Sequence, residues 1–419
     1  MRLTQLKSQR TSLLVCIACF VTYVAICMNR TIYSSAMSEI ISQGMLTKTN
    51  AGTINASFYL FYSATQFMGG YMADRFSPFK IIIVGLAGAI ITSFVMAISK
   101  SFAVMLVAWT LNGISQFGSW PATLKILSTV PEKSHKRLFL YVISFGYCTG
   151  TILSYLCAAL VLTGLGWRML FHISAIILLA SVSFFFFAYL QVKTELKQDE
   201  GIEIKNTLPQ KEEKEKDNVR LMPVLVKSGL VILLMPALIR GMLDVGLKSW
   251  IPTMLMENYG VSSSFASMLT TILLIINLSG VFMVQSLYPR KIKNIVLLLT
   301  LAFLICLPMI CLMIFMGKIS VWFIIAFLTI STTMTYAGNQ MFNVIIPTCF
   351  SKHQKTGTVA GILNAFACFG IFVANFLYGW LSEKFGWTVV IVFWISIAAI
   401  ALIMSAMATP LWSKFTKKN

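Results

Sequence analysis

Residues 294–316 read NIVLLLTLAFLICLPMICLMIFM, an apolar run that contains no charged residue. About 20 apolar residues are enough to cross a hydrocarbon core about 30 Å thick as a helix. Lipid offers no partner for backbone N–H and C=O groups, so a run of this length must be helical. Comparable runs recur along the whole chain, and we predict an all-α membrane protein with twelve spanning helices. The expected spans are residues 12–36, 51–72, 79–99, 103–126, 138–162, 168–190, 224–255, 263–287, 294–316, 319–346, 357–382 and 386–408.

The composition and the distribution of charge also indicate a membrane protein. Hydrophobic residues make up 58% of the sequence and charged residues only 11%, far outside the usual range of soluble domains. The net charge of +19 does not indicate a nucleic-acid partner, because 24 of the 33 Lys and Arg residues fall on one side of the membrane and five on the other. This bias follows the positive-inside rule for an even number of crossings. We therefore expect a multi-pass protein of the cell membrane with both termini in the cytoplasm.

Matching residues recur at a nearly constant spacing, which indicates a duplicated unit. Adding 210 to the residue number carries Arg30 onto Arg240 and Gly70 onto Gly280. Between the sixth and seventh spans lies a polar stretch rich in Lys and Glu, as expected of a linker. We predict two pseudo-symmetric six-helix bundles. The expected boundaries are an N-terminal bundle at residues 1–191, a cytoplasmic linker at 192–222 and a C-terminal bundle at 223–419.

The segment between the second and third spans carries a motif. It reads GYMADRFSPFK at residues 70–80 and resembles the G-x-L-A-D-R-x-G-R-K loop of the major facilitator superfamily. The resemblance implies the major facilitator fold and a gating loop that includes Gly70, Asp74 and Arg75. Physically, Asp74 can cap a neighbouring helix or pair with a basic residue of the other half, and this lock would break when the cytoplasmic side opens. The alternative is a simple charged turn.

Two arginines inside the expected spans are the main candidates for a binding site. An Arg in the middle of a membrane helix costs roughly 2.5 to 3.5 kcal/mol on insertion scales, so it indicates a functional site. The duplication makes Arg30 and Arg240 counterparts about a pseudo-two-fold axis, and we expect both to face a central cavity. Two guanidinium groups form a receptor for a phosphate or a carboxylate.

Charged neighbours of Arg240 leave a second interpretation open. Asp244 stands four residues after Arg240, and an i,i+4 ion pair would neutralise this arginine without any ligand. Asp244 is also the sole obvious titratable group for proton coupling. Lys248 lies two turns beyond Arg240, where it either guides anions as a third cation or extends to the membrane interface.

Polar and aromatic residues on the helices expected to line the cavity complete the predicted site. Each of them has the alternative role of a helix–helix hydrogen bond. The expected substrate-binding residues besides the arginines are Asn29, Tyr33, Gln116, Trp120, Tyr147, Asn339 and Asn343, and Asn112 shares the helical face of Gln116. The three histidines lack metal-ligand spacing, and no nucleotide-binding or nucleophile motif is present, so we expect no enzyme, no metal and no cofactor.

These residues together resemble the organophosphate:phosphate antiporter family, typified by the bacterial glycerol-3-phosphate transporter, over essentially the whole chain. The landmarks are Asn29-Arg30, Gly118-Ser-Trp-Pro121, Arg240 followed by Leu243-Asp244, and Trp250-Ile-Pro-Thr253. The resemblance implies that Arg30 and Arg240 hold the phosphate of the substrate. Tyr147 stands where the family carries a substrate-binding histidine, so a sugar acid or another carboxylate stays open beside a phosphate ester.

We therefore expect a secondary active transporter that moves a small organic anion by rocker-switch alternating access, in exchange for phosphate or together with protons. The expected partners are this anion and the lipid bilayer, and the chain is expected to be a monomer. Two alternatives stay open. One is a proton-driven exporter of cationic or neutral compounds that uses Asp244, and the other is a transport-like sensor that binds an anion without moving it.

Overall fold

The computed structural model describes residues 8–131, 138–139, 142–200, 221–316, 320–350 and 356–418. Every regular element in these residues is a helix, which confirms the expected all-α fold. The first group comprises α1 (Gln9–Ser42), α2 (Lys48–Arg75), α3 (Pro78–Ile98), α4 (Phe102–Ser115), α5 (Ser119–Thr129), η1 (Ile143–Phe145), α7 (Gly146–Val161) and α8 (Trp167–Glu200). The second comprises α9 (Leu221–Lys227), α10 (Leu230–Gly241), η2 (Met242–Gly246), α11 (Leu247–Tyr259), α12 (Ser263–Leu287), α13 (Ile295–Met316), α14 (Val321–Gln340), η3 (Met341–Ile345), α15 (Ile346–Thr348), α16 (Thr356–Phe385) and α17 (Trp387–Lys418).

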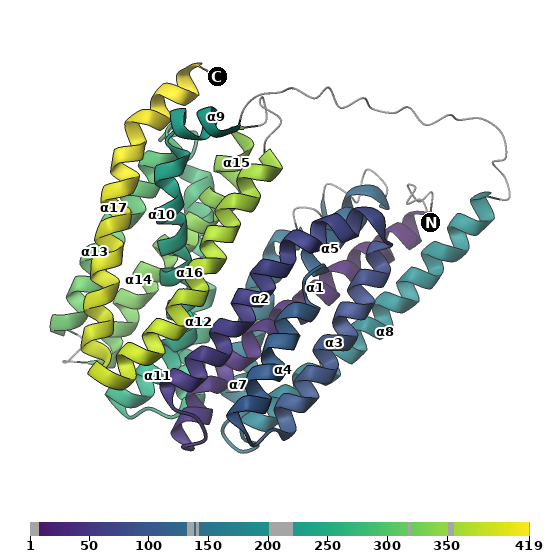
Figure 1. Ribbon diagram of the computed structural model, residues 1–419, viewed down its shortest axis with the longest axis horizontal. Coiled ribbons are helices and arrows are strands. Elements are labelled where there is room, and N and C mark those ends of the chain that lie inside the picture. Colours follow the sequence, from purple (N-terminus) through teal and green to yellow (C-terminus); the bar gives the residue numbers. More distant parts are fainter. Residues whose placement is uncertain are drawn as a thin grey trace.

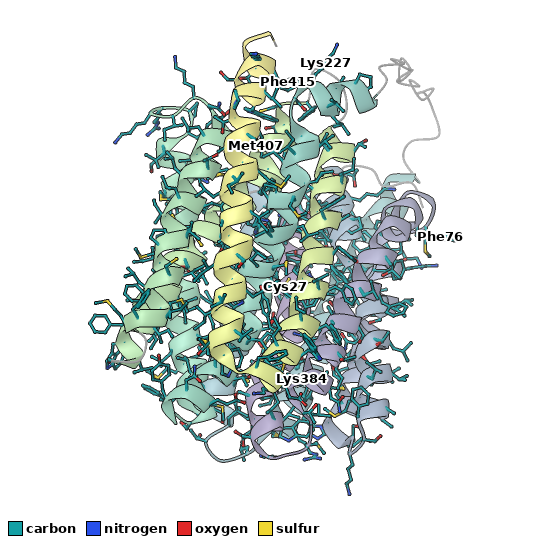
Figure 2. The ribbon with its side chains drawn as sticks, turned by 60° about the vertical axis from the view of Figure 1, so that its left-hand side comes forward. Cys27, Phe76, Lys227, Lys384, Met407 and Phe415 are labelled. Atoms are coloured by element: carbon teal, nitrogen blue, oxygen red, sulfur yellow. The ribbon has the colours of Figure 1, made fainter. Side chains whose placement is uncertain are left out.

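The lengths of the helices agree with the expected membrane crossings. Nine helices within the described residues are long and apolar enough to span a membrane. The three other expected spans correspond to α2, to α4 with α5, and to η1 with α7. Figure 2 shows Lys227 and Lys384 at opposite ends of the molecule, with exposed apolar side chains such as Met407 between them. This arrangement suits a lipid belt around the middle of the protein.

The two groups of helices lean against each other (Figure 1). They approach at the end that carries the α7 and α11 labels and diverge toward the end where the two termini lie. Helix α8 continues to Glu200 and α9 begins at Leu221, so the first residues of the expected linker are helical. Residues 201–220 lie outside the described residues, and the boundaries expected for the two halves therefore stay a prediction.

Three spanning segments are interrupted within their length. A π-helical turn, Met242–Gly246, joins α10 to α11, and a second, Met341–Ile345, joins α14 to α15. Residues 116–118 separate α4 from α5. Pro121 and Pro347 lie in the first turn after two of these interruptions, where the missing N–H is tolerated. Interruptions of this kind are frequent at functional sites because they redirect side chains and free backbone groups.

Polar contacts join the two groups near the end where they approach. Asn55 donates to the side chain of Asn375 over 2.7 Å, and the Lys48 ammonium lies 2.9 Å from a carboxylate oxygen of Glu257. These residues belong to the N-terminal part of α2 and to α16 and α11. The described structure is therefore held together at the end that the distribution of Lys and Arg assigns to the outside.

A proline explains one further contact between the groups. Pro252 in α11 has no N–H, so it leaves the carbonyl of Lys248, four residues earlier, without its helical donor. The hydroxyl of Tyr155 on α7 donates to this carbonyl over 3.0 Å. The first group thus satisfies a backbone acceptor that the sequence of the second group leaves open.

Two glycines allow helices α2 and α16 to pack closely against each other. A Cβ atom at Gly52 would lie 2.3 Å from the carbonyl oxygen of Asn375, and one at Gly379 would lie 2.6 Å from that of Lys48. Both distances are far below ordinary contact, so any side chain at these positions pushes the helices apart. Gly361 on the same helix, α16, has open space around its Cβ position.

We predict that Gly379→Ala weakens the contact between α2 and α16 and increases access to the buried face behind it. The measurement is the rate at which a thiol reagent labels a cysteine introduced by Ser249→Cys, a position that is 1% exposed. Because overpacking typically costs about 1–3 kcal/mol, labelling should accelerate at least about fivefold. Gly361→Ala is the matched control and should leave the rate unchanged. Equal rates in the two variants would contradict the packing argument.

Candidate functional site

Arg30 on α1 is buried and only partly paired. Its side chain is held by an amide and an aromatic ring: Nε donates to Oε1 of Gln116 over 3.3 Å, and Cζ lies 4.2 Å from the ring centre of Tyr62. The residue is 6% exposed, and its Nη2 atom has no hydrogen-bond partner among the described residues. Gln116 occupies the interruption between α4 and α5. Arg30 therefore carries an unused donor inside the protein.

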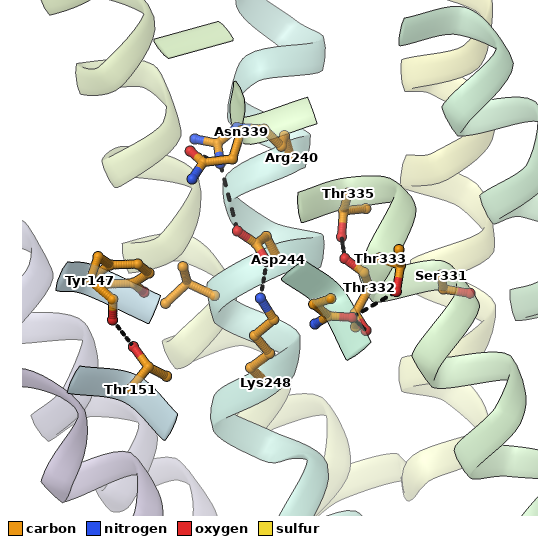
Figure 3. A network of polar contacts seen from close by, with 12 residues as sticks. Tyr147, Thr151, Arg240, Asp244, Lys248, Ser331, Thr332, Thr333, Thr335 and Asn339 are labelled. Carbon is orange, nitrogen blue, oxygen red and sulfur yellow. Dashed lines mark hydrogen bonds and ion pairs between the residues drawn. The ribbon is translucent and has the colours of Figure 1, made fainter. Parts of the chain in front are cut away.

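Arg240 at the end of α10 has a closely similar environment. Its Nη1 donates to Oδ1 of Asn339 over 3.0 Å and lies 3.7 Å from Oδ2 of Asp244 (Figure 3). The residue is 4% exposed, and its Nε atom has no partner within the described part of the chain. Each arginine is thus held by the amide oxygen of a residue beside a helix interruption. A contact of this kind occurs once in each group of helices.

Asp244 and Lys248 form a buried pair inside the second group. Lys248 donates to Oδ1 of Asp244 (Figure 3), and the two residues are 6% and 1% exposed, respectively. The ammonium also lies 4.7 Å from the ring centre of Tyr336. Lys248 therefore does not extend to a membrane interface. Asp244 lies in the π-helical turn, and its contact with Lys248 is closer than its contact with Arg240.

The charges of this region do not cancel. The two arginines and Lys248 contribute three positive charges and Asp244 contributes one negative charge, which leaves a net of +2. Asp244 is shared between two cations, so it does not fully neutralise Arg240. No ion pair involving Arg30 occurs among the described residues. Such an excess of buried positive charge favours a nearby negative charge.

Two residues lie near both arginines, although the arginines come from different groups of helices. Tyr147 at the start of α7 and Cys368 on α16 each lie within electrostatic range of both guanidinium groups. Figure 3 shows Tyr147 on the side of the first group, opposite Arg240 and Asp244. The expectation that both arginines face one cavity stays a prediction.

The structure places the other predicted site residues in two sets. Gln116 and Asn339 contact the arginines, Tyr147 lies near both, and Asn343 reaches Arg240 through Asn339, to whose Oδ1 it donates. Asn29 contacts Gln116 but points its amide nitrogen at Ser93 and Ser174.

Two aromatic candidates lie in packed surroundings instead. Tyr33 is fully buried, its ring centre lies 5.4 Å from that of Trp109, and its hydroxyl donates to the carbonyl of Ala51. Trp120 packs against Tyr23 with 4.8 Å between ring centres. The structure does not bring either of them into contact with an arginine within its described residues. Both remain proposals as substrate contacts, with packing as the role that their surroundings support.

The expected gating residues Gly70, Asp74 and Arg75 fall in the last turns of α2. Their side chains lie outside the described residues, so the lock expected for Asp74 stays a prediction. The backbone continues as a helix through Arg75, and the break comes at Phe76 and Ser77. The motif at residues 70–80 therefore comprises the end of α2, a two-residue break and the first residues of α3.

Tyr62 and Cys368 belong to the site but are not apparent from the sequence. Tyr62 covers the guanidinium of Arg30, and Cys368 lies within electrostatic range of both arginines. One usable signal is the spacing of Tyr59 and Tyr62, which places two aromatic hydroxyls on one face of α2. A single cysteine in an apolar span gives no comparable signal.

Comparison with known proteins supports a transporter. The sequence profile described as "Major Facilitator Superfamily" matches residues 19–337. The chain is 22% identical to the "Probable hexose phosphate transport protein" of Chlamydia pneumoniae, over 96% of this chain and 90% of that protein. It is 24% identical to the "Membrane sensor protein UhpC" of Salmonella typhimurium, over 37% of this chain and 35% of that protein.

Solved structures resemble the fold along its whole length. A bacterial homologue of the human lysosomal transporter Spinster, in an inward-facing and unoccupied conformation, matches with a TM-score of 0.73 over 98% of both chains at 15% identity. A D-xylose-proton symporter matches with a TM-score of 0.69 over 98% of this chain and 100% of that chain at 14% identity. At these identities the likeness shows the fold alone.

We predict that Asp244→Asn destabilises the protein because it leaves Lys248 as a buried cation without a counter-charge. Breaking a buried ion pair from one side typically costs about 3 kcal/mol or more. The double variant Asp244→Asn/Lys248→Met returns the net charge to +2 and should recover most of this loss. Thermal unfolding in detergent, followed by intrinsic fluorescence, measures both. A double variant no more stable than Asp244→Asn alone would contradict the pairing.

Proposed function

The chain belongs to the Major Facilitator Superfamily, and we propose that it exchanges a small phosphate-bearing organic anion across the cell membrane by alternating access. The observation that carries this proposal is the pair of buried arginines, one in each group of helices. Each is oriented by an amide and keeps one nitrogen without an acceptor among the described residues. An anion between them supplies the missing acceptors, and Arg recognises phosphate through its planar fork of donors.

The excess of charge favours a dianion. A phosphate monoester carries about −1.5 to −2 near neutral pH, whereas a simple carboxylate carries −1. The net of +2 around Arg30, Arg240, Asp244 and Lys248 matches the phosphate better. A relative aligned with 96% of this chain is named as a hexose phosphate transport protein, which agrees with this substrate class. A sugar acid is the competing substrate that an experiment must exclude.

The contacts of Asp244 argue against a proton-driven exporter of cations. Such an exporter needs a carboxylate available to the cargo or to a proton. Asp244 is 1% exposed, paired with Lys248 and 3.7 Å from Arg240, so two cations of the protein already occupy it. A sensor that binds an anion without moving it is the other alternative, and one relative is named as a membrane sensor.

Alternating access provides a role for the charge. With the site empty, the two guanidinium groups repel each other and oppose closure of the groups of helices around them. A bound anion replaces this repulsion by attraction to both, which lowers the barrier to movement of the halves. In this proposal residues 1–191 and 223–419 are the moving units, residues 192–222 tether them, and both termini are cytoplasmic.

We predict that Arg30→Gln and Arg240→Gln each abolish counterflow of labelled inorganic phosphate in proteoliposomes. Each substitution keeps a polar side chain but removes one positive charge and the fork of donors, and we expect rates at least about 100-fold lower. Arg168→Gln is the control, because Arg168 lies elsewhere, over the ring of Trp167 and bonded to the carbonyl of Ser99. Parent-like exchange by either site variant would refute the assignment. Binding without exchange by the parent would favour the sensor.

We also predict that glycerol 3-phosphate inhibits phosphate counterflow at a concentration at least about tenfold lower than glycerate does. The two compounds share a polyol backbone and differ in their anionic group, so the comparison isolates the charge and shape of that group. A buried site with a net charge of +2 should prefer the dianion. The measurement is the half-inhibitory concentration of each at neutral pH. Equal potencies, or a preference for glycerate, would point to a carboxylate transporter.

A further inference from the structure

A network of three buried amide side chains leads to Arg30: Asn29 on α1, Asn112 on α4 and Gln116 directly after α4. Gln116 is its central member. The amide nitrogen of Gln116 donates to Oδ1 of Asn29 over 3.1 Å and to Oδ1 of Asn112 over 2.7 Å, while its Oε1 accepts from Nε of Arg30. Both N–H groups of the Gln116 amide are therefore in use, and its oxygen is left to face the arginine.

A backbone carbonyl fixes which way these amide groups point. The amide nitrogen of Asn112 donates to the carbonyl of Ala89 over 3.2 Å and to Oγ1 of Thr92 over 2.8 Å. A carbonyl can only accept, so the nitrogen of Asn112 must point at Ala89 and its oxygen must point at Gln116. The orientation of Gln116 follows, because its nitrogen must meet that oxygen.

Asn29 anchors the same amide from the opposite side. Its nitrogen donates to the hydroxyl of Ser93 on α3 over 2.7 Å and to that of Ser174 on α8 over 2.9 Å, which leaves its oxygen for Gln116. Asn29 and Asn112 are both 0% exposed, and Gln116 is 3% exposed. In each of the three amides both the nitrogen and the oxygen are hydrogen-bonded, so the orientation of every amide group is determined.

The orientation of the Gln116 amide determines the position of Arg30. If the Gln116 amide were reversed, its nitrogen would face Nε of Arg30, and two donors would repel each other. The guanidinium would leave its present place over Tyr62, 4.2 Å from the ring centre, and the unpaired Nη2 would lose its orientation. We infer that Asn112 and Asn29 are positioning residues, which hold the Gln116 oxygen on Arg30 so that the free N–H of this arginine meets the substrate anion. This inference rests on the proposed function.

In the second group of helices the amide that contacts the arginine is held by fewer partners. The oxygen of Asn339 accepts from Arg240 and from Asn343 on the same segment. A matched control residue lies in this group: Asn277 on α12 is 1% exposed and accepts from Thr332 over 3.0 Å and from Thr333 over 2.9 Å. Asn277 joins two helices as Asn112 does, but none of its hydrogen bonds in the described structure leads to an arginine.

The test compares Asn112→Leu with Asn277→Leu in proteoliposomes, with labelled inorganic phosphate as the probe. We expect Asn112→Leu to raise the half-saturating phosphate concentration about fivefold to tenfold, the effect of one misplaced hydrogen bond, with a nearly unchanged maximal rate. Asn277→Leu should leave the half-saturating concentration at the parent value. Asn29→Leu removes the other acceptor of the Gln116 amide. If Asn112→Leu does not fold, Asn29→Leu should show the same rise in the half-saturating phosphate concentration.

A double variant separates positioning from general destabilisation. Asn112 acts through Gln116, so Asn112→Leu should add no further rise in a Gln116→Leu background. Additive rises, equal shifts in Asn112→Leu and Asn277→Leu, or a parent-like Asn112→Leu would overturn the inference while the parent still exchanges phosphate. A parent that neither binds nor exchanges phosphate would instead overturn the proposed function, and the inference with it.

Discussion

Two guanidinium groups buried within a membrane protein are the constraint on which the rest of this structure depends. A buried charge is tolerated only where hydrogen bonds and counter-charges replace its hydration. Here the replacement is incomplete, because Arg30 and Arg240 each keep a nitrogen without a partner among the described residues. Amide oxygens orient the arginines without neutralising them, which a carboxylate in the same place would do. The fold therefore preserves much of the positive charge on which the proposed binding of an anion depends.

The same requirement explains why polar side chains concentrate at the interruptions of the helices. A continuous helix satisfies its own backbone and offers only side chains, whereas a π-helical turn or a break changes where those side chains point. Gln116 lies at one break, Asp244 within one π-helical turn, and Asn339 just before the other. Helix α1 has no such interruption, and its arginine relies on the amide that α4 presents.

The sequence predicts the fold well, and it singles out the two arginines, because both inferences follow from the cost of placing polar groups in lipid. It does not decide which cation Asp244 pairs with, since Arg240 and Lys248 stand four residues away on either side of it. The π-helical turn at Met242–Gly246 changes the facing of these side chains, and a pattern based on 3.6 residues per turn cannot anticipate it. Tyr33 is a similar case: it follows Arg30 by almost one turn, yet its ring packs against Trp109. Contacts from distant helices, such as those of Tyr62 and Cys368, depend on helix packing, which cannot be inferred from the pattern of a single sequence.

Lys248 connects the binding region to the contact between the two groups of helices. Its ammonium pairs with Asp244 beside Arg240, while its carbonyl, left without a helical donor by Pro252, accepts from Tyr155 on α7. Any movement that separates α7 from α11 must break this bond, and the freed carbonyl then needs water or another donor. The bond that breaks and the charged pair both involve Lys248, so a change in this contact occurs directly beside the pair. If Lys248 made only one of these two contacts, no single residue would connect the ion pair with Asp244 to the contact between α7 and α11.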